Sequence, residues 1–206
     1  MSTRSALHAL VGLIGTVLTL ACGPAAQPIV VTGPFTAEHE TAFENGIDYI
    51  ADPTILEGSW LRSWEDDIDR RVHLSDAIAF VTITTLRQDV DLDRHETFRL
   101  IARVDRERHG TLPDEISFVV RQGQPGFGTV TGNDARILNQ RFVAFVKWAE
   151  EDGQIVGRWH LSPASERVVR RVNTIVERVH TAPDERRTII VRESEEGSSG
   201  ETEDEE

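Results

Sequence analysis

The chain of 206 residues has one cysteine and one lysine. Because Cys22 stands alone, no disulfide can form within the chain. Arginine supplies nearly all of the basic charge beside Lys147, an excess that we attribute to codon usage. The formal net charge is −13. A nucleic-acid-binding surface needs the opposite balance, so we expect no nucleic-acid partner.

The sequence also lacks a complete catalytic or metal-binding motif. A metalloprotease helix needs a second histidine four residues after a His-Glu pair, but Arg99 occupies that position after His95. Residues 89–93 resemble the start of a calcium loop, but Arg94 stands where the turn requires glycine. We therefore predict no catalytic residue, no metal ligand and no cofactor, and we do not expect an enzyme.

The N-terminus has the pattern of a secretory leader. Arg4 is the only charged residue among residues 1–34, and residues 7–20 are almost wholly apolar. That run suits a signal peptide and is short for a membrane span. It ends in Leu20-Ala21-Cys22, which resembles the lipobox of bacterial lipoproteins, where a small residue precedes a cysteine. The alternatives are an ordinary leader or an uncleaved anchor.

The resemblance implies a modification and a location. In lipoproteins the thiol receives a diacylglycerol, the chain is cut before the cysteine, and the new amine is acylated, for example with palmitate. Here Cys22 would join the bilayer through these acyl chains, and residues 1–21 would be the signal peptide. Aspartate after the cysteine retains such proteins in the inner membrane, so Gly23 implies the outer membrane, facing the periplasm. Residues 22–56 are predicted to be a lipid-attached linker, with one short helix near residues 37–43.

Two amphipathic helices are predicted beyond the linker. The first begins with Ser59 as its N-cap. Charged pairs four residues apart, Asp66 with Arg70 and Asp67 with Arg71, are expected on its exposed face. The second begins at residues 162–163, a serine followed by a proline. Apolar residues recur at three- and four-residue spacing on the core faces of the two helices, which include Trp60, Leu61, Trp64, Ile68 and Val72 in the first and Val168, Val172, Ile175 and Val179 in the second.

Five strands are predicted between these helices, at residues 77–85, 98–104, 116–120, 142–148 and 155–161. Apolar and polar residues alternate in most of them, which is typical of a half-buried sheet. The order of three strands, a loop with a short helix, and a two-strand hairpin resembles the OB-fold. An open sheet or a sandwich has the same pattern. We expect Trp148 and Trp159 in the core.

The predicted fold class is therefore mainly β with flanking helices (α+β). It would be a small five-stranded OB-like barrel or open sheet, packed by the two amphipathic helices. The folded domain is expected to span residues 57–192. Residues 193–206 contain acids and no base and are predicted to be a disordered acidic tail.

A glycine-rich loop at residues 122–133 is the candidate partner-contact site. Gly126, Phe127 and Gly128 form its centre, with Phe127 expected to be exposed. The alternative is a turn that packs one aromatic residue. We expect a membrane-anchored binding or assembly module with an envelope protein as its partner. The alternative is a small-molecule- or glycan-binding barrel, which includes the case of a hydrolase whose site forms only in three dimensions.

Overall fold

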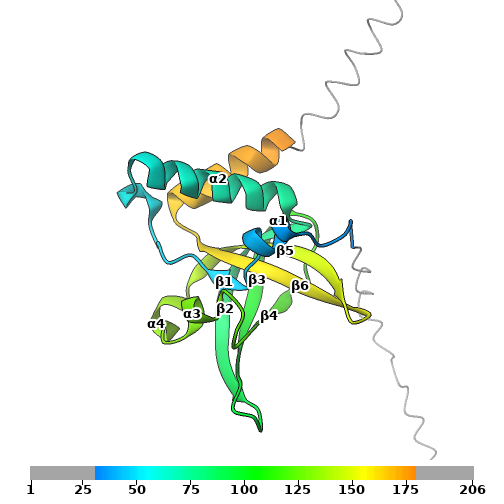
Figure 1. Cartoon of the computed structure of the whole chain (residues 1–206). Coiled ribbons are helices and arrows are strands. Elements are labelled where there is room, and N and C mark those ends of the chain that lie inside the picture. The colour runs from blue at the N-terminus through cyan, green and yellow to red at the C-terminus, as the bar shows by residue number, and fades with distance from the viewer. Residues whose placement is uncertain (1–30, 180–206) are drawn as a thin grey trace, which may run out of the picture.

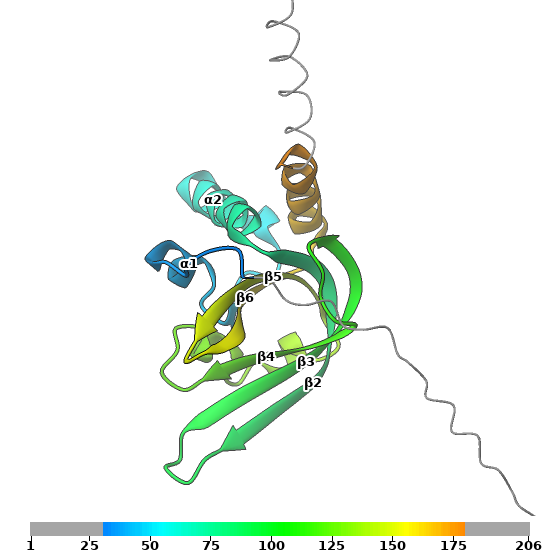
Figure 2. The same cartoon turned by 90° about the vertical axis from the view of Figure 1, so that its right-hand side faces the viewer.

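The computed structural model describes residues 31–179 (Figure 1). Six strands form one mixed sheet in the order β1-β6-β5-β2-β3-β4, and the sheet curls into a half-barrel (Figure 2). Within this range, no helix is long and apolar enough to cross a membrane. The strands are β1 (Gly46–Ile47), β2 (Ala77–Val90), β3 (Glu96–His109), β4 (Glu115–Arg121), β5 (Arg141–Glu151) and β6 (Gln154–Pro163).

The helices are mostly short, apart from two that lie on the sheet. The predicted helix near residues 37–43 is confirmed. It is α1 (Ala37–Ala42). The other helical segments are the 3₁₀ turn η1 (Pro53–Ile55), α2 (Gly58–Leu74), α3 (Phe127–Val130), α4 (Asp134–Ile137) and a helix at 166–179.

The mainly β class with helices is confirmed, and all five predicted strands are present. The predicted strand count is wrong, because β1 adds a sixth strand that pairs in parallel with β6. A strand of two residues has no detectable alternation of apolar and polar residues, so periodicity could not reveal it. The folded part also begins before residue 57, since α1, β1 and η1 lie in the range assigned to the linker.

The two faces of the sheet bury separate cores. The concave face buries side chains from all six strands, among them Val81, Phe118, Phe142 and Trp159. The convex face of β2 and β5 is covered by α2 and by the helix at 166–179, shown in orange (Figure 2). β2 is therefore apolar on both faces over its first half. The predicted packing of two amphipathic helices on the sheet is confirmed.

Both predicted helix starts are wrong. α2 begins at Gly58 with Glu57 as its N-cap, two residues before the predicted cap. Residues 162 and 163 belong to β6, because Pro163 still pairs with Phe142 of β5. The next helix starts at 166, where the hydroxyl of Ser165 accepts a hydrogen bond from the Val168 N–H at 3.4 Å. The pairing of β6 with β5 through Pro163 therefore moves the start of the helix to residue 166.

Trp159 joins the two sides of the half-barrel. Its Nε1–H on β6 donates to the backbone carbonyl of Val119 on β4 at 3.1 Å. Its ring lies 5.2 Å from that of Phe118. Trp159 and Trp64 are buried as predicted, and Trp148 packs partly buried against the inner core. Trp60 is 75% exposed, so its predicted place in the core is wrong.

The β2–β3 hairpin extends away from the rest of the sheet as an arm (Figure 1). The pairing of β2 with β5 ends at Thr82, whereas its pairing with β3 continues to Val90. At the tip, the Asp91 N–H donates to the His95 carbonyl at 3.1 Å, and an Asp91 carboxylate oxygen accepts from the His95 N–H at 2.8 Å. The acidic run at 89–93 is thus part of an exposed hairpin end.

Candidate functional site

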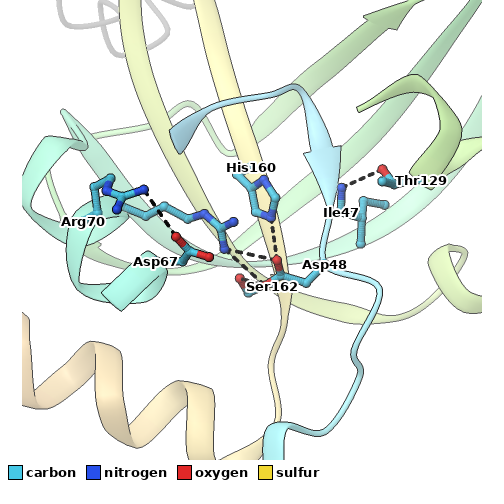
Figure 3. A network of polar contacts seen from close by, with 8 residues as sticks. Ile47, Asp48, Asp67, Arg70, Thr129, His160 and Ser162 are labelled. Carbon is cyan, nitrogen blue, oxygen red and sulfur yellow. Dashed lines mark hydrogen bonds and ion pairs between the residues drawn. The ribbon is translucent and has the colours of Figure 1, made fainter. Parts of the chain in front are cut away.

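A buried polar network forms where β1 meets β6. The parallel pairing places Ile47 beside Leu161, and the next residue, Asp48, donates its N–H to the Leu161 carbonyl at 3.0 Å. One carboxylate oxygen of Asp48 accepts from His160 Nε2 at 2.8 Å (Figure 3). The other accepts from Ser162 Oγ at 2.5 Å. Arg71 of α2 donates Nη1 to the same carboxylate at 3.1 Å.

The network holds Asp48 charged and His160 neutral. Burial alone would raise the pKa of Asp48, but the hydrogen bond from His160, the positive charge of Arg71 and the hydrogen bond from Ser162 hold it well below its usual range. Burial lowers the pKa of His160, and the positive charge of Arg71 adds to that effect. The Nδ1 atom of His160 is buried without a hydrogen-bond partner. A neutral ring that donates from Nε2 fits this site, because a protonated ring would bury an unsatisfied N–H.

This arrangement is a structural tie rather than a nucleophile site. In a hydrolase triad the histidine accepts a hydrogen bond from the serine hydroxyl, whereas here the Ser162 hydroxyl donates to Asp48. The tie joins β1, β6 and α2. The predicted pair of Arg71 with Asp67 is wrong, because Arg71 pairs with Asp48 at 3.1 Å and Asp67 pairs with Arg70 at 3.3 Å. The predicted pair of Asp66 with Arg70 is also wrong, because Arg70 pairs with Asp67 instead.

The single lysine is also part of a buried structural pair. Lys147 is 6% exposed, and its Nζ lies 2.8 Å from Asp76 Oδ1. It also donates to the hydroxyl of Thr32 at 2.8 Å. The second carboxylate oxygen of Asp76 accepts from the Trp148 N–H at 2.9 Å. Lys147 therefore links β5 to the segment before β2 and to the N-terminal segment near residue 32.

Part of the predicted contact loop packs inward, at Gly126 and Phe127. The Gly126 N–H donates to the Glu44 carbonyl at 3.0 Å, and a Cβ atom at Gly126 would lie 2.3 Å from the Asn45 carbonyl oxygen. Phe127 is half-buried, and its ring lies 5.3 Å from that of Phe98. The prediction of an exposed Phe127 is therefore wrong, and the alternative of a turn that packs one aromatic holds. Gly128 remains exposed.

A cleft of about 310 Å³ lies beside this loop, between α3, α4 and the start of β5. Buried side chains of Ile47, Ile137 and Phe142 line it together with polar residues. Two of its lining residues, Arg136 and Arg141, are basic, and no aspartate or glutamate lines it. Sequence reasoning missed this cleft because its residues come from three separate parts of the chain, at 47–51, 129–142 and 163.

Each of the two cleft arginines has a partner in the fold, and neither partner lines the cleft. Arg136 donates Nη2 to the Tyr49 carbonyl, which is a neutral partner. Arg141 is 64% exposed, and its Nε lies 3.6 Å from Asp105. A larger groove of about 440 Å³ between α2 and the helix at 166–179 differs in this respect. There two of the arginines pair with acidic residues that also line the groove, Arg167 with Glu65 and Arg170 with Glu166.

The remaining predictions concern metal ligands, the lipidation site and the acidic tail. No group of three His, Cys, Asp or Glu side chains that could hold a metal ion occurs between residues 31 and 179. Cys22, the predicted lipidation site, and the acidic tail at 193–206 lie outside the described residues. Comparison of the chain with models of protein families finds no match, and comparison with curated proteins finds none.

Proposed function

We propose that the chain is a bacterial envelope lipoprotein, held at the outer membrane by acylated Cys22 and facing the periplasm. Its folded part is a binding module and not an enzyme. The apolar run at 7–20, which ends at the single cysteine, supports the anchor. The buried polar networks support binding over catalysis, since Asp48 and Asp76 are each occupied by bonds that join elements of the fold.

We further propose that strands β2 to β6 form an OB-like barrel that stays open between β4 and β6. β2 pairs with both β3 and β5, β4 pairs with β3, and β6 pairs with β5. This succession supports a partly open five-stranded barrel. The Trp159 side chain spans the opening, and β1 extends the sheet beyond β6.

The cleft at Arg136 and Arg141 is the observation that carries the binding function. Its volume of about 310 Å³ lies at the lower end of small-molecule sites. Two guanidinium groups without a lining carboxylate favour an anionic group, even though the chain has a net charge of −13. Planar arginines bind carboxylates through paired hydrogen bonds. The apolar floor suits the remainder of such a ligand, so we assign the cleft to an organic carboxylate.

The carboxylate has two possible sources, which match the two classes of function considered from the sequence. A free small carboxylate would make the protein a small-molecule-binding barrel. A C-terminal carboxylate of another protein would make it an assembly module. Both sources present the same group to the arginines, so the experiment needs one arm for each.

Calorimetric titration of the full chain in detergent with 3-phenylpropionate should show saturable binding. The tripeptide Ala-Ala-Phe with a free carboxylate forms the second arm. We expect the corresponding amides not to bind, because they lack the charge that the arginines recognise. Arg136→Gln and Arg141→Gln should each weaken binding about tenfold, as expected for loss of a charge-assisted hydrogen bond.

The control for this titration is Arg106→Gln, an exposed arginine of β3 that does not line the cleft. It should bind the acids as the wild type does. Equal binding of acid and amide would contradict the assignment, as would an Arg106→Gln loss equal to the others. If only the tripeptide binds, the carboxylate comes from a protein chain.

The lipid anchor makes a separate prediction. Cys22→Ser should abolish incorporation of labelled palmitate and leave the precursor uncut, because no other thiol is present to receive the lipid. Labelling in cells followed by gel electrophoresis measures both effects. Ser5→Ala, a change in the same leader that leaves the cysteine intact, is the matched control. Palmitate incorporation by the Cys22→Ser chain would contradict the anchor.

A further inference from the structure

The projecting half of β2 exposes an open strand edge. Within residues 31–179, residues 85–90 of β2 pair with β3 on one side only, because the ladder to β5 ends at Thr82. The last contacts on the β5 side are the two backbone hydrogen bonds of Ile83 to Asn139 and Gln140. Figure 2 shows β2 at the border of the arm. An open edge of this length is a template for pairing with another strand.

The backbone groups that point outward can be identified. The hydrogen bond from the Asp91 N–H to the His95 carbonyl marks a hydrogen-bonded pair. Such pairs alternate along an antiparallel ladder, and the register stays regular from residue 85 to residue 90. Arg87 and Asp89 therefore direct their N–H and C=O groups to β3. Leu86, Gln88 and Val90 direct theirs to the open edge.

We propose that this edge pairs with the same edge of a second copy of the chain, antiparallel and centred on Gln88. In that register Leu86 and Gln88 face the partner's Val90 and the partner's Gln88, and each such pair exchanges two backbone hydrogen bonds. The two half-barrels then share one continuous sheet. Val90, which is 58% exposed on the arm, lies beside the partner's Leu86.

Charge selects the second copy and the register. Arg87 faces Arg99 directly across β2 and β3, an arrangement of like charges that destabilises a sheet. Pairing centred on Gln88 sets Arg87 beside the partner's Asp89 on the same face, and the twofold axis repeats this ion pair. Pairing centred on Arg87 would instead oppose two arginines, and pairing centred on Asp89 would oppose two aspartates. The edge is thus complementary to itself in one register.

The contact is small and involves six residues of β2 at most, the stretch 85–90. Interfaces of this size are weak in solution. Confinement of both copies to one membrane raises their effective concentration, so the proposal gains from the lipid anchor but does not depend on it. Disulfide cross-linking in intact cells can detect such a contact, whereas dilution of the purified protein would dissociate it.

The test is oxidation with copper phenanthroline of intact cells that make the full chain with Gln88→Cys. The Cα atoms of facing residues in a hydrogen-bonded pair lie about 5.5 Å apart, within the range of a disulfide. We expect a disulfide-linked homodimer on a non-reducing gel. The wild type, whose single cysteine is Cys22, supplies the background, and Thr174→Cys, an exposed position on the helix at 166–179, is the control.

Charge reversal distinguishes this pairing from random collision. On the Gln88→Cys background, Arg87→Glu and Asp89→Arg should each reduce the dimer yield about tenfold, because each opposes like charges twice per dimer. The double reversal should restore the yield, since it exchanges the two charges. All these positions are exposed. A Gln88→Cys yield no higher than that of Thr174→Cys overturns the proposal, as does a double reversal without recovery or a cross-link to a different protein.

Discussion

Asp48→Ala is expected to lower the free energy of unfolding by about 3–5 kcal/mol, the cost of removing one partner of a buried ion pair. The Arg71 side chain is only 10% exposed, so the substitution would leave its charge buried without the Asp48 carboxylate. His160 and Ser162 would also lose their acceptor. Urea unfolding of the full chain in detergent, followed by tryptophan fluorescence, measures the change.

The matched control for Asp48 is Asp67→Ala. Asp67 also pairs with an arginine of α2, but the side chains of this pair are 38% and 47% exposed. Exposed pairs of this kind contribute about 0–1 kcal/mol, so the control should change little. Equal losses in the two variants would show that Asp48 does not tie the elements together.

The difference between wild type and Asp48→Ala should depend on pH in one direction. The pKa of Asp48 is held well below its ordinary value of 3.8 in the folded protein. A lowered carboxyl pKa stabilises the fold fully above the unfolded pKa, and the stabilisation is lost as pH falls through the folded value. The difference should therefore stay constant from pH 8 to about pH 5 and shrink below about pH 4. A difference that grows on acidification would contradict this account of the network.

Trp159→Ala is expected to cost about 3–5 kcal/mol of stability. The indole is 1% exposed, packs on Phe118 and donates to the Val119 carbonyl. Truncation leaves a cavity, removes that hydrogen bond and weakens the link between β6 and β4. The same urea unfolding measurement, with a shift of the transition midpoint, records the loss.

Trp60→Ala provides the comparison for Trp159. The same residue type is removed, but Trp60 is 75% exposed in the first turn of α2. A surface substitution of this kind usually changes stability by less than about 0.5 kcal/mol. If Trp60→Ala were as costly as Trp159→Ala, the exposed indole would have to pack against something outside residues 31–179.

The sequence alone determined the elements with a clear period. Alternation of apolar and polar residues located four of the five long strands, and a run of apolar residues located β2. The three- and four-residue spacing of Trp64, Ile68 and Val72 located α2 and its buried face. These patterns are local, so each can be identified without knowing what the segment packs against.

Only the tertiary structure decided which residues pair with one another and which side chains are buried. Arg71 lies four residues after Asp67, yet it pairs with Asp48, a residue of a separate segment that the sheet brings under α2. The cleft also depends on distant segments, because Ile47 and Pro163 line it together with the two arginines. Trp60 and Trp64 share a predicted stripe, but the sheet covers only the later turns of α2. Local spacing sets which residues share a face, whereas burial and pairing depend on contacts between distant segments, which no local pattern encodes.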